Sequence, residues 1–296
     1  MGLKENNRGV IESPDSHKLL EQHKKLLKIR DIKLKDLKLE LSEFNFSKEM
    51  KLVLSLYALT LVLAEFVTVS LEPTKSILFL VVIIISLIIL SSLSSSKKFS
   101  YLLQALILIP LLRIMSLSIP ATEIDPVYWL AITILPLIAS CIFLMQGQGR
   151  NRTDIGLNLK NLPVQILVVW GGLAMGFIAY LILKPPVIVS NLNTINLLVS
   201  IIILLSVGFT LELIFRGIIQ KNADNLMGKH WGLIFVSILF TIQSINWNSV
   251  PYLAFVFGVS IIYGYIFQKT NSISGVGLSH GIANVMFFLI LPLSQL

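Results

Sequence analysis

The chain has 296 residues, of which 55% are hydrophobic and only 14% are Asp, Glu, Lys or Arg. A soluble domain of this length exposes far more charge, so the composition excludes an ordinary soluble protein and predicts an integral membrane protein. The net charge of +8 does not predict nucleic-acid binding, because the basic excess lies in the N-terminal tail and in the loops, where membrane proteins carry it. The single cysteine, Cys141, excludes an internal disulfide and a cysteine-rich metal site.

The N-terminal segment, residues 1–49, is polar and contains no apolar stretch typical of a cleavable signal peptide. We expect residues 1 to about 17 to be disordered. From His17 to Leu41, leucines recur every seven residues with lysines between them, which predicts a basic amphipathic helix. Two interpretations are open: a helix on the anionic cytoplasmic membrane surface, or a short coiled coil or docking helix for a partner.

Apolar runs that approach or reach the roughly 20 residues of a bilayer-spanning helix follow one another along the rest of the chain. They predict an all-α fold, a polytopic membrane bundle with eight or nine transmembrane helices. The last three spans are the least regular, and two of them are short enough to be tilted helices shielded by the others. The predicted spans are Leu52–Leu71, Ser76–Ser95, Tyr101–Ile119, Pro126–Met145, Val164–Leu183, Asn196–Ile219, Trp231–Ile245, Pro251–Phe267 and Ile273–Leu291.

The loops between these spans alternate in charge. If the N-terminus is cytoplasmic, the inner loops hold most of the basic residues, and the outer loops hold Lys75 and Lys184 with the acidic Glu123 and Asp125. This bias predicts a cytoplasmic N-terminus. We divide the chain into the tail (1–49), a first group of transmembrane helices (50–150) and a core (151–296) that carries the polar motifs.

The stretch GFTLELIFRGIIQ places Glu212 and Arg216 four residues apart inside an apolar run. With the acid N-terminal to the base, this spacing favours a side-chain pair, and charges inside a membrane are costly enough to suggest a role. Two interpretations are open: an ion pair that ties helices together, or part of a polar site. Arg216 is also close enough to the cytoplasmic end of its span to extend toward the interface.

Two further groups of polar residues lie inside predicted spans. His280 and Asn284 are again four residues apart and therefore share a helix face, where two donors can bind a carbonyl oxygen or stabilise an oxyanion. Glu65 and Arg113 are single charges on separate helices that can pair with each other. Gly172 and Gly176 form a small-xxx-small pair that permits close helix packing.

The motifs LELIFRG, LFTIQS and SGVGLSHGIANV, in this order, resemble the CPBP family, which includes the type II CAAX prenyl endopeptidases and Abi-type membrane proteins. That family carries a double glutamate and a following arginine, then Phe-x-x-x-His, then His-x-x-x-Asn. The resemblance covers roughly 154–291. It implies a CAAX-protease-like core and an intramembrane protease site formed by Glu212, Arg216, Phe240, His280 and Asn284.

Two positions depart from the family pattern. Leu211 stands at the first glutamate and Ser244 at the second-motif histidine, and the resemblance implies that these two positions activate water in the family. Leucine cannot accept a proton, and serine needs a neighbouring base. Zinc needs at least three protein ligands, whereas this site offers His280 and, if available, Glu212. The zinc ligand set is therefore incomplete. Zinc is left open as the one candidate metal, and no other cofactor is predicted.

Three functional hypotheses follow. The first is a non-catalytic or strongly impaired family member, a pseudoenzyme that binds and stabilises a membrane protein or peptide partner. The second is an active intramembrane endopeptidase that cleaves near the C-terminus of lipidated or hydrophobic peptides. The third is a transporter or another helical bundle with accidental motifs. The expected partners are membrane lipids and a hydrophobic or prenylated peptide or another membrane protein.

Overall fold

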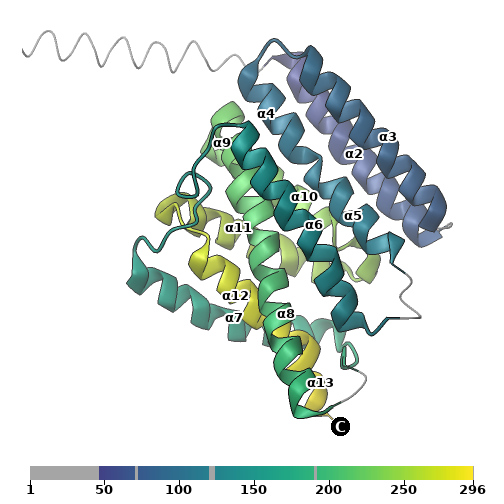
Figure 1. The fold of residues 1–296 in the computed structure, drawn as a ribbon, viewed down its shortest axis with the longest axis vertical. Helices are drawn as coiled ribbons and strands as arrows, with labels where there is room; N and C mark the ends of the chain where they lie inside the picture. The colour runs from purple at the N-terminus through teal and green to yellow at the C-terminus, as the bar shows by residue number, and fades with distance from the viewer. Residues whose placement is uncertain (1–46, 71–72, 120–123, 190–191, 296) are drawn as a thin grey trace, which may run out of the picture. The chain divides into compact units, whose positions relative to one another are not determined.

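The computed structural model describes residues 47–70, 73–119, 124–189 and 192–295. The predicted amphipathic helix from His17 to Leu41 lies outside these residues. From Lys48 onward the chain forms one unit, and the predicted division of this unit at residue 150 stays a prediction. The described residues form helices joined by short connections (Figure 1).

Eight of the described helices are long and apolar enough to cross a bilayer, with α4 and α5 together counting as one and α8, η1 and α9 as another. This confirms the predicted all-α polytopic bundle. In chain order the helices are α2 (Lys48–Ser70), α3 (Pro73–Leu93), α4 (Lys97–Leu106), α5 (Leu108–Ser118), α6 (Pro126–Gly147), α7 (Leu162–Leu183), α8 (Thr194–Glu212), η1 (Leu213–Gln220), α9 (Lys221–Met227), α10 (Lys229–Ile242), η2 (Ile245–Trp247), α11 (Val250–Thr270), α12 (Ser274–Val285), η3 (Met286–Ile290) and α13 (Leu291–Leu293).

Local sequence explains where several helices start. Asp125 accepts a hydrogen bond from the Val127 amide at the start of α6, Asn193 does so for α8, and the Ser249 hydroxyl caps α11. Such side chains satisfy amide groups that have no partner in the first turn. At the other end of α11, Asn271 adopts a left-handed conformation, which stops the helix and turns the chain toward α12.

The predicted span Trp231–Ile245 corresponds to α10, which has 14 residues and ends at Ile242. At 1.5 Å per residue this helix is about 21 Å long, shorter than a hydrocarbon core of about 30 Å. Of the two predicted counts, eight spanning helices therefore agrees with the described residues, and α10 is a shorter apolar helix. The early end of α10 leaves Gln243 and Ser244 in a turn rather than on a helix.

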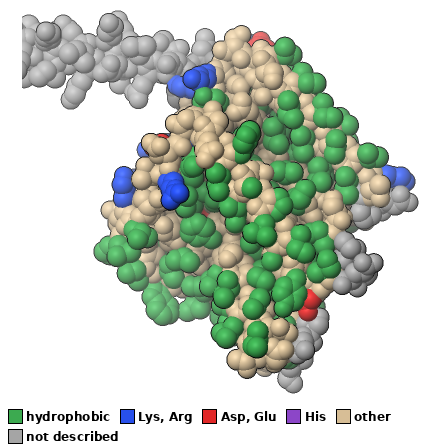
Figure 2. Space-filling model, viewed as in Figure 1, with side chains coloured by type: hydrophobic (Ala, Val, Ile, Leu, Met, Phe, Trp, Pro, Cys, Tyr) green, Lys and Arg blue, Asp and Glu red, His purple; other side chains and the backbone are tan. Residues whose placement is uncertain are grey.

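Hydrophobic side chains cover much of the visible face of the molecule (Figure 2). Many of them are large and exposed, such as Phe66, Phe143 and Leu167. In water such a surface would be strongly unfavourable, whereas it suits contact with lipid chains.

The helix α12 packs closely against both α7 and α8 (Figure 1). A Cβ on Gly172 or Gly176 would collide with the backbone of α12, and one on Gly208 would collide with Gly281. The predicted small-xxx-small pair therefore lies at a helix contact, and Gly208 and Gly281 form a second one. These glycines let the backbones approach closely and bring α8 and α12, which carry the motifs, together.

The helix α8 continues as a π-helix, η1, directly after Glu212. All eight residues of η1 are buried. π-Helical turns are rare and occur frequently at functional sites, because the wider turn redirects side chains. The span predicted as Asn196–Ile219 consequently runs without a break from Thr194 to Met227.

Candidate intramembrane site

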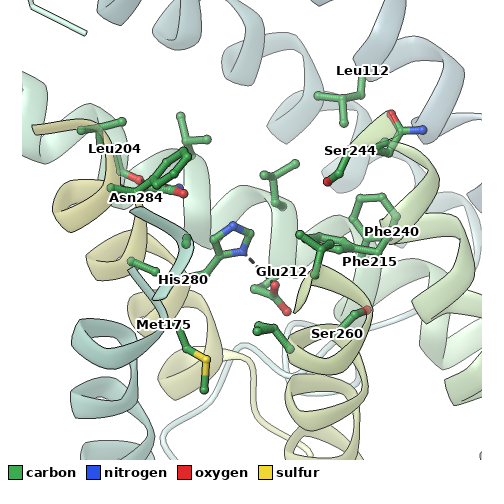
Figure 3. A pocket seen from close by; sticks show the side chains of 18 of the residues that line it. Leu112, Met175, Leu204, Glu212, Phe215, Phe240, Ser244, Ser260, His280 and Asn284 are labelled. Carbon is green, nitrogen blue, oxygen red and sulfur yellow. Dashed lines mark hydrogen bonds and ion pairs between the residues drawn. The ribbon is translucent and has the colours of Figure 1, made fainter. Parts of the chain in front are cut away.

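Glu212, the last residue of α8, is the centre of a buried polar cluster. Its side chain is fully buried. Its Oε2 accepts a hydrogen bond from Nε of Arg216 at 3.0 Å, and its Oε1 lies 2.9 Å from Nδ1 of His280 on α12 (Figure 3). The predicted i,i+4 ion pair therefore forms. The carboxylate also binds His280, and both of its oxygens are engaged.

Arg216 on η1 is also fully buried. Its remaining nitrogens donate to Oε1 of Gln220 at 3.4 Å and to Oγ of Ser260 on α11 at 2.9 Å, and the guanidinium lies 5.5 Å from the ring centroid of Phe240. The expectation that Arg216 extends toward the membrane interface is wrong. Its charge is instead neutralised internally, as a buried guanidinium requires.

His280 and Asn284 lie on one face of α12, as their spacing predicts. The ring of His280 packs against Phe240 and Tyr263, with centroid distances of 5.9 and 6.4 Å. Asn284 Nδ2 donates to the backbone oxygen of Leu204 at 3.4 Å, which is long for a hydrogen bond. Asn284 is therefore held only weakly against α8.

A cavity of about 300 Å³ joins these groups. The structure brings together every site residue expected from the sequence, since all of them line this cavity. Figure 3 shows Ser244 on the opposite side of the pocket from Asn284. Their chemical roles stay predictions. The expected residues that line it are Leu211, Glu212, Arg216, Phe240, Gln243, Ser244, His280 and Asn284.

Several cavity residues were not assigned to the site from the sequence. Ser260 and Tyr263 come from α11, and Arg113 comes from α5. Arg113 forms the expected pair with Glu65, with NH2 of Arg113 2.7 Å from Oε2 of Glu65. Ser260 and Tyr263 are polar groups three residues apart on an apolar helix, a signal that the sequence does contain.

The donor set does not fit a structural or catalytic zinc. Among the described residues there is no group of three or more His, Cys, Asp and Glu side chains that could hold a metal ion. The two candidate ligands, Glu212 and His280, are hydrogen-bonded to each other. Zinc requires three or more such ligands.

The carboxylate on Nδ1 determines what His280 can do. A neutral imidazole in this contact donates its Nδ1 proton to Glu212, so Nε2 carries a lone pair and acts only as an acceptor. Only the doubly protonated ring can donate from Nε2 to a carbonyl oxygen or an oxyanion. The predicted oxyanion role of His280 therefore requires an imidazolium.

A bundle of apolar helices around a buried carboxylate, imidazole and guanidinium defines a polytopic membrane protein with an intramembrane polar site. Residues 193–286 match the family model described as Rce1-like, type II CAAX prenyl endopeptidase Rce1-like, so the predicted resemblance to the CPBP family is confirmed over this segment. The segment contains Glu212, Ser244, His280 and Asn284, whereas Arg113 lies outside it. Comparison with curated proteins and with solved structures found no match.

Proposed function

We propose that the chain is a non-catalytic or strongly impaired CAAX-protease-like protein whose cavity binds a short apolar peptide segment of a membrane-embedded partner. The observation that carries the proposal is the state of the only carboxylate among the described cavity residues. Glu212 is fully buried, and its two oxygens bind Arg216 and His280. A carboxylate in these contacts is not available to take a proton from water.

The two departures from the family pattern lie in the same cavity. Leu211 contributes an apolar side chain where the family has a glutamate, and Ser244 contributes a hydroxyl where it has a histidine. The leucine side chain has no group that can accept a proton, and the serine hydroxyl is not a base at neutral pH unless a neighbouring base removes its proton. The cavity thus keeps groups that can bind a peptide carbonyl, and it lacks the pair that the family resemblance connects with water activation.

The size of the cavity agrees with a short occupant. Its volume of about 300 Å³ lies at the lower end of the range of small-ligand pockets, about 300–1,000 Å³. A short peptide segment is an occupant of suitable size.

One contact favours a second candidate function, an active intramembrane endopeptidase. The 2.9 Å contact between Glu212 and Nδ1 of His280 is the kind of contact by which a carboxylate orients a catalytic histidine. In the neutral ring, Nε2 then carries the lone pair and can act as a base. Water activation by His280 would replace the missing glutamate.

We also infer that the N-terminus is cytoplasmic. The connections before α7 and after α11 meet the start of α9 at one end of the bundle: Asn158 donates to the Asn271 backbone oxygen at 2.8 Å, and Lys221 donates to Oδ1 of Asn271 at 2.7 Å. The same end carries Arg150, which donates to Asn222 at 2.6 Å. A basic end of this kind is retained on the cytoplasmic side.

The test is a restoration of the two family residues. The wild type and the double variant Leu211→Glu, Ser244→His are purified, and cleavage of prenylated and of hydrophobic peptides is measured. We expect cleavage only by the double variant, because a positioned acid–base group contributes about 10²–10⁴-fold in rate. Leu211→Gln, Ser244→Asn is the matched control, with similar shapes and no base.

Comparable cleavage by the wild type would contradict the proposal. In that event His280→Gln separates the two candidates, because it removes the only imidazole among the described cavity residues. Loss of the wild-type cleavage in this variant would establish the endopeptidase that uses His280.

A further inference from the structure

The cavity has a second polar region, far in sequence from the motifs. Arg113 on α5 lines the same cavity as Glu212 and His280, although α5 lies outside the segment that matches the family model. Glu65 on α2 accepts a hydrogen bond from NH2 of Arg113 at 2.7 Å, and the side chains of Arg113 and Glu65 are 14% and 2% exposed. Arg113, paired with Glu65, therefore contributes a charged group of the N-terminal helices to the cavity wall.

Arg113 is incompletely satisfied, unlike Arg216. A guanidinium carries five N–H donors. Arg216 uses all three of its nitrogens within the protein, whereas Arg113 donates only from NH2, and its Nε is buried without a partner. Buried donors of this kind are rare and unfavourable in folded proteins. NH1 of Arg113 has no hydrogen bond to a described residue and is not among the buried unpaired atoms, so it is the donor that an acceptor in the cavity can meet.

The neighbouring polar groups do not supply this acceptor. The Ser116 hydroxyl donates to the backbone oxygen of Arg113, Trp129 Nε1 donates to the Ser116 backbone oxygen, and Thr133 donates to the Trp129 backbone oxygen. Each of these side chains is therefore engaged with the backbone. Of the polar side chains on this side of the cavity, Arg113 is the one with several donors to spare.

The charge of the pair indicates what the acceptor is. Glu65 balances Arg113, so the region offers N–H donors with little net charge. A cation is excluded by the guanidinium, and an oxygen acceptor, either a carbonyl or a carboxylate, fits. An intact transmembrane helix has no free carbonyl along its length, because its backbone groups bond to one another.

We propose that Arg113, held in place by Glu65, binds an oxygen acceptor of the peptide segment in the cavity, through a contact separate from those of His280 and Asn284. The inference rests on the proposed function, since it assumes a peptide occupant. It adds a specificity residue from the N-terminal helices. It also restricts the occupant to a segment with an unpaired backbone carbonyl or a free C-terminal carboxylate.

The test measures peptide binding to the full chain in nanodiscs. The probe is a fluorescent hydrophobic peptide of about five residues, prepared as a free acid and as a C-terminal amide. The variant Glu65→Gln, Arg113→Met removes both charges together and leaves no unpaired partner. Arg152→Met is the control, because Arg152 is exposed and lies outside the lining of this cavity.

We expect the double variant to bind at least about 10-fold more weakly, as loss of a hydrogen bond from a charged donor predicts. Equal losses for both peptides identify a carbonyl as the acceptor, and a loss confined to the free acid identifies the C-terminal carboxylate. Unchanged affinity of the double variant for both peptides would overturn the inference.

A photoreactive analogue distinguishes failure of this inference from failure of the proposed function. Phe255 lines the cavity, and benzoylphenylalanine in its place captures an occupant of the cavity. If the photoreactive protein captures the peptide and the double variant binds it with unchanged affinity, the role of Arg113 is overturned. The proposal that the cavity binds a peptide then stands. No saturable binding and no crosslink to either peptide overturns both.

Discussion

Nδ1 of His280 lies 2.9 Å from Oε1 of Glu212, although 68 positions separate the two residues in the chain. The contact joins α8 to α12 at the point where both helices contribute family motifs. It also gives the buried carboxylate a partner on each oxygen, because the other oxygen of Glu212 binds Arg216. Glu212 is therefore held in a polar cluster and is not a free base.

Removal of one charge from this cluster should strongly destabilise the protein. Arg216→Met leaves the Glu212 carboxylate buried without its counter-charge, and breaking a buried pair in this way costs about 3–5 kcal/mol. Thermal unfolding in detergent measures the loss. The double variant Glu212→Gln, Arg216→Met should be less unstable than Arg216→Met alone. A double variant of equal or lower stability would contradict this account of the pair.

The histidine contact should also contribute to stability. His280→Phe leaves Oε1 of Glu212 buried without one of its partners, which costs about 1–3 kcal/mol. His280→Gln retains an amide N–H that can donate, so we expect it to recover part of the loss. Denaturation by guanidinium or by heat, compared across the three proteins, gives the order. Identical stability of the Phe and Gln variants would contradict a hydrogen bond to Glu212.

The close crossing of α8 and α12 should not tolerate even a methyl group. A Cβ at Gly208 meets the backbone of Gly281 and His280, so Gly208→Ala forces the helices apart at a cost of about 1–3 kcal/mol. Gly258→Ala is the matched control, because a Cβ there has no neighbour within 4 Å. We expect that variant to be more stable by about 0.5–1 kcal/mol, the helix preference of alanine.

The proposed orientation can be tested by cysteine labelling in intact cells and inverted vesicles. The background is Cys141→Ala, since the native cysteine is buried. A membrane-impermeant maleimide should label Arg152→Cys only from the cytoplasmic side and Lys75→Cys only from the opposite side. Both native side chains are exposed. Labelling of both cysteines from one side would disprove the topology, and the reverse pattern would invert it.

Much of the fold follows from local sequence. The apolar runs predicted the long helices, because a bilayer sets a minimum length that is visible in composition alone. The i,i+4 spacing of Glu212 and Arg216 and that of His280 and Asn284 placed each pair on one helix face. The end of Trp231–Ile245 was placed too late, because Ile245 and Trp247 follow the polar Gln243 and Ser244 and their hydrophobicity alone does not show that α10 ends at Ile242.

The composition of the site depended on how the helices pack against one another. The family motifs indicated which residues belong together, but Arg113 and Ser260 lie outside those motifs and enter the site through packing of α5 and α11. For Arg216 the sequence left two positions open, a buried ion pair with Glu212 and a side chain that extends to the interface, and the structure has the buried one. The polar types of Arg113 and Ser260 are visible in the sequence, but their meeting in one cavity is not, because it depends on how separate helices pack.

The sequence by itself determined that the chain is a polytopic helical membrane protein with a charged pair on one helix and a histidine–asparagine pair on another. Helix length, hydropathy and side-chain spacing are local properties, and they suffice for this. Only the tertiary structure decided that Glu212 is shared between Arg216 and His280, and that Arg113, paired with Glu65, borders the same cavity. The contact between α8 and α12 requires their backbones to approach closely, which Gly208 and Gly281 permit. Such packing depends on several segments of the chain together, so no single segment of the sequence shows it.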